Sequence, residues 1–186
     1  MKLHFLGANR QVTGSRYCLE TGQVKLMIDC GLFQERPYQD RNWHDSPIPP
    51  GEIDAMLLTH AHLDHCGLIP RLVREGFRGP IYCTRPTVEL CGVVLRDSAK
   101  IQEEDAAYKQ KRHRREDRRA KHPEIPLYTI ADAEQALPLF RGVPYRKRVE
   151  ICPGVSFLLH DAGHILGSAM LELQVDQEQQ FPATCV

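Results

Sequence analysis

The stretch Thr59-His60-Ala61-His62-Leu63-Asp64-His65 places three imidazoles and one carboxylate within six residues. The largely apolar run at residues 53–59 predicts a buried central strand, so these side chains would follow the carboxyl end of that strand. Neutral imidazole and carboxylate are preferred donors for zinc and similar divalent ions, and open α/β sheets bind ligands at this end of their strands. The motif therefore predicts a metal centre made by His60, His62, Asp64 and His65.

A second histidine motif reads DAGHILGSA at residues 161–169, directly after a predicted strand. The small neighbours of His164 would let the backbone approach a metal closely. A pair formed by His60 and His62 needs a third protein ligand to leave one tetrahedral position open for water, and His164 is the best candidate. A turn histidine without a ligand is the alternative here, and His160 could line the same pocket.

A third signal is Asp29, which ends a predicted strand just before Gly31. Metal-bound histidines usually donate their second N–H to a carboxylate or a carbonyl. Asp29 would be a natural acceptor of this kind behind a metal-binding histidine. From the residues alone, a simple turn aspartate is an equally good interpretation.

Periodicity and turn residues predict an alternation of strands and helices, which is typical of an α/β domain. A long helix should begin near Pro86, with the apolar positions Leu90, Val94, Ile101 and Tyr108 on one face. We expect one partial domain over residues 1–175 and a short polar tail, 176–186, that does not fold. The predicted strands cover residues 3–6, 16–20, 25–28, 53–59, 80–83, 146–151, 155–160 and 169–175, and further helices cover 68–73 and 131–140.

Composition restricts the setting in which the protein works. The formal net charge is zero, so no global field would draw the whole molecule onto nucleic acid or a membrane. Seven cysteines occur without a C-x-x-C pair, which is typical of reduced thiols in the cytosol. No stretch approaches the roughly 18 apolar residues of a membrane span. We expect a cytoplasmic protein, and the sequence leaves its oligomeric state open.

Residues 109–121 carry eight basic side chains among thirteen. Such a run could form a positive stripe for a phosphate backbone. The solvated face of an exposed helix is the favoured interpretation, because Glu116 and Asp117 interrupt the run.

Taken together, the motifs resemble the metallo-β-lactamase superfamily. Its signature H-x-H-x-D-H is met by residues 60–65, its first-motif aspartate by Asp29 and its third-motif histidine by His164. The segments at 6–8, 12–15 and 162–169 resemble the β-CASP branch, which contains RNA-processing nucleases.

The resemblance implies an αββα sandwich that binds two zinc ions. It assigns His60, His62 and His164 to one ion, and Asp64 and His65 to the other. Asp64 and His65 would be the catalytic residues, with Asp64 orienting or deprotonating the attacking hydroxide. The implied substrate is RNA, which the protein would cleave as an exoribonuclease or as an endoribonuclease.

Two parts of the family pattern are not found in this sequence: a Gly-Asp motif downstream of His164 and a final histidine that completes the second site. The inserted cap domain of the β-CASP branch is not found either. We therefore expect a C-terminally truncated fold whose second metal site is incomplete.

Two other functions remain open. A small-molecule hydrolase of thioesters or lactams predicts a shorter interval than the hundred or so residues between His65 and His164. A non-catalytic zinc-binding remnant is favoured by the missing aspartate.

Overall fold

The computed structural model describes residues 1–116, 124–176 and 183–185. Within these residues, six strands form one sheet in the order β1-β2-β3-β4-β5-β6. The first three strands pair antiparallel, whereas β3, β4, β5 and β6 run parallel. Their bounds are β1 Lys2–Phe5, β2 Tyr17–Glu20, β3 Lys25–Ile28, β4 Ala55–Leu57, β5 Ile81–Cys83 and β6 Phe140–Gly142.

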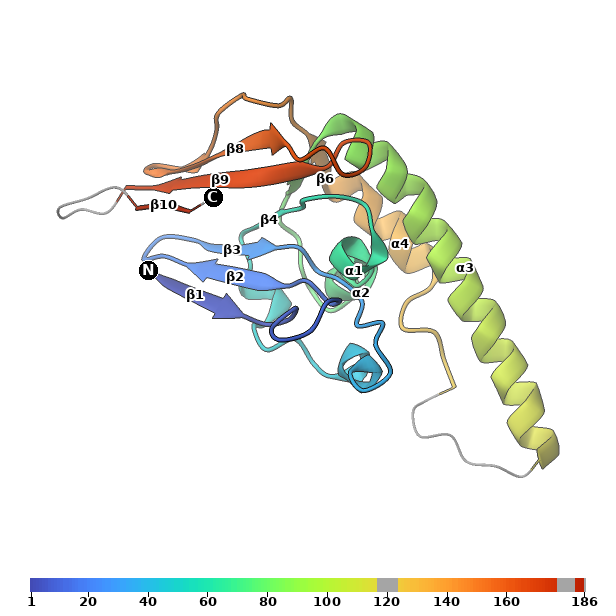
Figure 1. Ribbon diagram of the computed structural model, residues 1–186. Helices are drawn as coiled ribbons and strands as arrows, with labels where there is room; N and C mark the ends of the chain where they lie inside the picture. The colour runs from blue at the N-terminus through green and yellow to red at the C-terminus, as the bar shows by residue number, and fades with distance from the viewer. Residues whose placement is uncertain (117–123, 177–182, 186) are drawn as a thin grey trace.

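In the described part of the chain, four α-helices lie on one side of this sheet (Figure 1). They are α1 Leu63–Cys66, α2 Ile69–Arg74, α3 Arg85–Glu116 and α4 Ile130–Ala136, and single 3-10 turns occur at Gln39–Trp43, Pro50–Glu52 and Leu137–Leu139. One apolar core fills the space between helices and sheet, with Met56 and Ile81 from the strands and Phe77, Leu95 and Tyr128 from the other side. Burial of these side chains is what attaches the helices to the sheet.

A second sheet covers the opposite face, with its strands in the order β10-β9-β8-β7 and all neighbours antiparallel. The strands are β7 Val149–Cys152, β8 Val155–Asp161, β9 Ala169–Val175 and β10 Ala183–Cys185. Strand β8 alternates buried and partly exposed residues, so Phe157 and Leu159 face inward. They pack against Leu26 and Leu57 of the first sheet in a second core.

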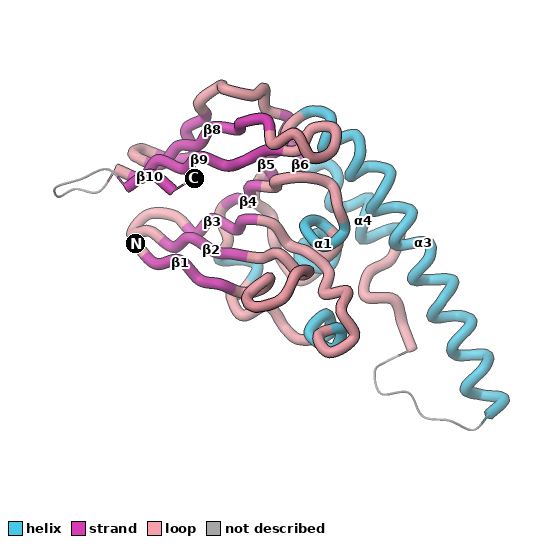
Figure 2. The backbone as a smooth tube through the Cα atoms, in the orientation of Figure 1, coloured by secondary structure: helices cyan, strands magenta, loops and turns pink. Residues whose placement is uncertain are grey.

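The predicted α/β fold is confirmed, with helices, first sheet and second sheet as three successive layers (Figure 2). Among the described residues, no helix covers the outer face of the second sheet. The strands predicted at 25–28 and 169–175 have the predicted bounds, and the long helix begins at Arg85.

The apolar face of the long helix is only partly buried: Leu90 packs against the core, whereas the later positions do not. Ile101 and Tyr108 are 51% and 64% exposed. The buried face instead carries Cys91, Leu95 and the small residues Ser98, Ala99 and Ala106. Small side chains let neighbouring segments approach, and the Tyr128 hydroxyl donates a hydrogen bond to Ser98 at 2.8 Å.

Two polar segments of the chain, the basic run at 109–121 and the tail at 176–186, are only partly described. Of the basic run, residues 109–116 lie in α3 and 117–121 lie outside the described residues. Of the tail at 176–186, residues 183–185 form β10, whereas 177–182 and 186 lie outside the described part. The division at residue 175 stays a prediction, although β10 extends the second sheet.

The cysteines whose side chains the structure describes are not paired with one another. Cys18, Cys30, Cys66, Cys83 and Cys91 are buried free thiols, and Cys152 is a free thiol of intermediate exposure. Among the helices that the structure describes, none combines the length and apolar composition that a membrane span requires.

Candidate metal centre

The carboxyl ends of neighbouring parallel strands bring the predicted site residues together. Asp29 directly follows β3, and residues 58–62 follow β4 and lead into α1. His164 reaches the same place from the loop between β8 and β9, in the second sheet. The site therefore lies where the two sheets meet, at the strand ends that bind ligands in open α/β sheets.

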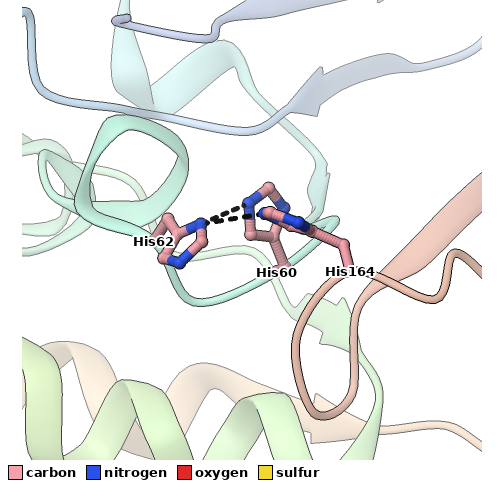
Figure 3. A group of neighbouring side chains, drawn as sticks. All are labelled: His60, His62 and His164. Atoms are coloured by element: carbon pink, nitrogen blue, oxygen red, sulfur yellow. Dashed lines mark hydrogen bonds between the residues drawn. The ribbon is translucent and has the colours of Figure 1, made fainter.

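Three imidazoles from these segments form a cluster (Figure 3). Nδ1 of His62 lies 3.1 Å from Nε2 of His60 and 3.2 Å from Nε2 of His164. One nitrogen from each ring falls within 4.8 Å of the other two, and His60 is buried while His62 and His164 are exposed. The cluster thus has a protein-covered side and an open side.

The spacing of these nitrogens fits a tetrahedral metal. Two nitrogens bound to zinc at 2.0–2.1 Å would lie about 3.3–3.4 Å apart at the tetrahedral angle. The two observed separations, 3.1 and 3.2 Å, need only small shifts to reach that value. Three histidines with one open position are the donor set typical of catalytic zinc.

The protonation state of His60 also suits a ligand. Burial of the ring, together with the nearby His65, lowers the pKa of His60 to about 4. The ring is therefore neutral near pH 7, which leaves a lone pair for a metal.

Asp64 and His65 form a separate pair beside the three histidines. Nε2 of His65 lies 3.5 Å from Oδ2 of Asp64, and the two side chains are 24% and 22% exposed. The His65 ring is tilted against that of His60, with centroids 4.0 Å apart. The structure thus places all five predicted metal residues in one region but groups three of them tightly.

Asp29 lies behind this region and is 2% exposed. Its Oδ2 accepts a hydrogen bond from Nδ1 of His65 at 2.7 Å, which directs Nε2 of that ring toward Asp64. Burial of His65 disfavours its charged form, but the bond to Asp29 and the charge of Asp29 raise the pKa of His65 overall. A carboxylate behind a histidine in this way fixes the tautomer and orientation of the ring.

Two hydroxyl groups at the site were not predicted. Thr59 donates to Asp29 through its backbone N–H at 2.9 Å, and its Oγ1 lies 3.0 Å from Nδ1 of His60. The Ser15 hydroxyl donates to Asp29 at 3.0 Å. The position of Thr59 next to the histidine motif was an available signal, whereas Ser15 lies far away in sequence.

The backbone around Gly31 holds the loop that carries Asp64. Cys30 N–H donates to the His65 carbonyl at 2.7 Å, and Ser15 N–H donates to the Asp64 carbonyl at 2.8 Å. A Cβ on Gly31 would stand 1.6 Å from the Asp64 carbonyl oxygen. Only glycine permits this approach, so the turn after β3 fixes the start of α1.

His160 does not line the site, contrary to the expectation. It belongs to the partly exposed face of β8, opposite the inward Leu159. Its Nε2 lies 2.8 Å from Oε2 of Glu172 on β9. Alternation along the strand is what turns its ring away from the three histidines.

A large groove lies elsewhere on the molecule. It has a volume of about 850 Å³ and runs beside α3, where Phe33, Trp43, Ile101 and Ile125 are among its lining residues. None of the five predicted metal residues lines it. This groove therefore does not lead to the three histidines.

The layered α/β fold and the three histidines at its strand ends together define the class of this protein: an α/β protein with a candidate metal centre. More closely, the chain belongs to the metallo-β-lactamase superfamily, since residues 18–182 match the family described as "Metallo-beta-lactamase superfamily domain".

Solved structures agree on the fold. Rm3 metallo-β-lactamase is similar with a TM-score of 0.56 and 16% identity, over 98% of this chain and 56% of that one. MEM-A1, a subclass B3 metallo-β-lactamase isolated from a soil metagenome library, gives a TM-score of 0.54 and 16% identity, over 92% and 55%. Identities this low show the fold alone.

Two relatives found by sequence have a higher identity to this chain than these solved structures. Ribonuclease TTHA0252 of Thermus thermophilus is 37% identical over 94% of this chain, and transcription termination factor FttA of Methanocaldococcus jannaschii is 33% identical over 95%. This chain spans 35% of the first relative and 25% of the second.

Proposed function

We propose that this chain carries the metal centre of a metal-dependent RNA hydrolase of the β-CASP type. The observation that carries the proposal is the convergence of His60, His62 and His164, with two nitrogen separations close to those around a tetrahedral zinc ion. The ribonuclease named above supplies the substrate class, because it is similar over nearly the whole chain.

We assign His60, His62 and His164 to one zinc ion, and Asp64 and His65 to a second. Bound zinc ions would lower the pKa of water and stabilise charge that develops on phosphoryl oxygens. Asp64 is partly exposed beside the cluster, so its carboxylate can accept a proton from water or orient it. Asp29 keeps His65 in the tautomer that offers Nε2 toward Asp64.

The second site has fewer protein donors than the first. Among the described residues, only the group of three histidines brings ligand atoms from three side chains together. Asp64 and His65 supply two donors, and a further carboxylate and histidine would complete that site. This difference supports tight binding at the first site and weaker binding at the second.

RNA would meet positive charge along the described end of α3. Lys109, Lys111, Arg112, Arg114 and Arg115 are all exposed there. Basic side chains on an exposed helix contribute salt-dependent contacts to phosphates. The free thiols in the described residues support the cytoplasm as the place of action.

The test is cleavage of a labelled single-stranded RNA by the full chain, with and without a chelator. We expect chelator-sensitive cleavage that His62→Ala abolishes and that His160→Ala leaves intact, because the His160 ring bonds to Glu172 of β9 and takes no part in the three-histidine group. A fluorogenic thioester and a chromogenic lactam are assayed in parallel.

The outcomes separate the functions. RNA cleavage lost in His62→Ala supports the proposal. Turnover of only the thioester or the lactam overturns it in favour of a small-molecule hydrolase. Zinc binding without any turnover overturns it in favour of a non-catalytic zinc-binding protein.

A further inference from the structure

The loop that carries His164 is exposed at its start and buried at its end. Residues 161–164 are exposed, whereas Gly167 and Ser168 are buried. Gly163 and Gly167 both have positive φ, at 64° and 80°. Glycine adopts such angles readily but adds flexibility, so the position of the His164 ring depends on how the buried end is held.

Two threonines hold that end. Thr84 follows β5, and Thr87 lies in the first turn of α3; they are 2% and 0% exposed. The Thr84 hydroxyl donates to the Gly167 carbonyl at 2.6 Å, and the Thr87 hydroxyl donates to the same oxygen at 2.9 Å. A carbonyl oxygen has two lone pairs, so both bonds can form at once.

Close packing accompanies these bonds. A Cβ on Gly167 would stand 2.7 Å from Oγ1 of Thr84 and 2.8 Å from both N and Oγ1 of Thr87. The loop therefore reaches the start of α3 only because residue 167 has no side chain.

Ser168 connects this anchor to His164. Its Oγ accepts the backbone N–H of His164 at 3.1 Å and that of Ile165 at 3.2 Å. Its carbonyl accepts the Tyr145 hydroxyl at 2.9 Å, and Ser168 itself is 1% exposed. A continuous set of bonds thus runs from the two threonines through Gly167 and Ser168 to the backbone of His164.

We infer that Thr84 and Thr87 are positioning residues for the metal centre: their hydroxyls fix the 163–168 loop so that the His164 imidazole meets those of His60 and His62. This inference rests on the proposed function. It makes β5 the third successive parallel strand, after β3 and β4, whose carboxyl end serves the site.

The test compares Thr84→Val/Thr87→Val with Thr84→Ser/Thr87→Ser. Valine keeps the shape and removes both hydroxyls, whereas serine keeps them. Zinc affinity is measured by competition with a chromophoric chelator, and Co²⁺ absorption reports the ligand geometry. We expect the valine variant to lose about 10- to 100-fold in affinity, as for other groups behind metal ligands, and the serine variant to stay near wild type.

A matched control separates positioning from general stability. Tyr128→Phe removes a buried hydrogen bond in the core between the helices and the first sheet. This change should lower the unfolding temperature without changing zinc affinity. Single Thr84→Val and Thr87→Val variants serve if the double variant does not fold. If the valine variants bind zinc as tightly as the wild type and show the same Co²⁺ spectrum, the positioning role of the two threonines is overturned and the proposed function is not. No metal binding by the wild-type chain would overturn the proposed function as well.

Discussion

Asp29 and His65 form an imidazole–carboxylate pair at the carboxyl ends of β3 and β4, with 2.7 Å between Oδ2 and Nδ1. The carboxylate also accepts from Ser15 and Thr59, so several groups fix its orientation. Asp29 has a positive φ of 57°, a conformation that aspartate tolerates better than most residues. Its position is therefore determined by the backbone turn and by its bonds together.

Replacing Asp29 with asparagine should weaken metal binding at the Asp64–His65 pair. The amide cannot accept all the bonds that the carboxylate accepts, and it carries no charge to hold the His65 N–H. We expect a loss of about 10- to 100-fold in affinity for the second zinc ion, measured by calorimetric titration. Asp54→Asn is the control, since Asp54 lies at the opposite end of β4. Equal affinities in the two variants would contradict the role of Asp29.

Replacing Asp64 with alanine should separate metal binding from turnover. The three-histidine group does not include Asp64, so the first ion should remain bound. RNA cleavage should fall below detection, because the carboxylate proposed to orient or deprotonate water beside the cluster would be missing. Elemental analysis and the labelled-RNA assay on one preparation check both parts. Cleavage that survives both Asp64→Ala and His62→Ala would refute the site assignment.

Tyr128 should contribute to stability and not to the metal centre. Its side chain is fully buried, and burial raises its pKa to about 12, so the hydroxyl stays protonated and donates to Ser98. We expect Tyr128→Phe to lower the free energy of unfolding by about 1 kcal/mol, the usual net contribution of one hydrogen bond. Urea unfolding followed by circular dichroism measures the change. An unchanged midpoint would mean that this bond does not stabilise α3.

Thiol reactivity should follow burial. Burial raises the pKa of Cys18 to about 11 and raises that of Cys83 as well, so both remain protonated thiols in the folded chain. Among the cysteines whose side chains are described, we expect Cys152 to react with iodoacetamide first. Peptide mapping by mass spectrometry at short reaction times gives the order. Early labelling of Cys18 or Cys83 would show that the core opens more readily than its packing indicates.

Local sequence patterns predict the parts of this fold that depend on neighbouring residues. The strand at 25–28 and the histidine motif are recognisable because apolar runs and ligand spacing are short-range features. The short α1 is not, since four residues are too few to show helical periodicity. Strand β6 was likewise missed, because Phe140–Gly142 is ordered by pairing with β5, distant in the sequence.

The same distinction applies to the site. His60 and His62 could be predicted as a pair because they stand two residues apart. The contacts of Thr84 with Gly167 and of Ser15 with Asp29 could not, because each joins segments that only the folded sheets bring together. The buried face of α3 could not be predicted for a related reason: Ser98 and Ala99 are buried by segments distant in the sequence, and apolar spacing alone does not reveal them.

Whether His60, His62 and His164 hold a metal is decided by the zinc content of the purified full chain, determined by elemental analysis after dialysis against a weak chelator. We expect at least one tightly bound zinc ion per wild-type chain, lost in His60→Ala and His62→Ala and retained in His160→Ala. Absence of zinc from the wild-type chain, or equal zinc in wild type and His62→Ala, would contradict this expectation.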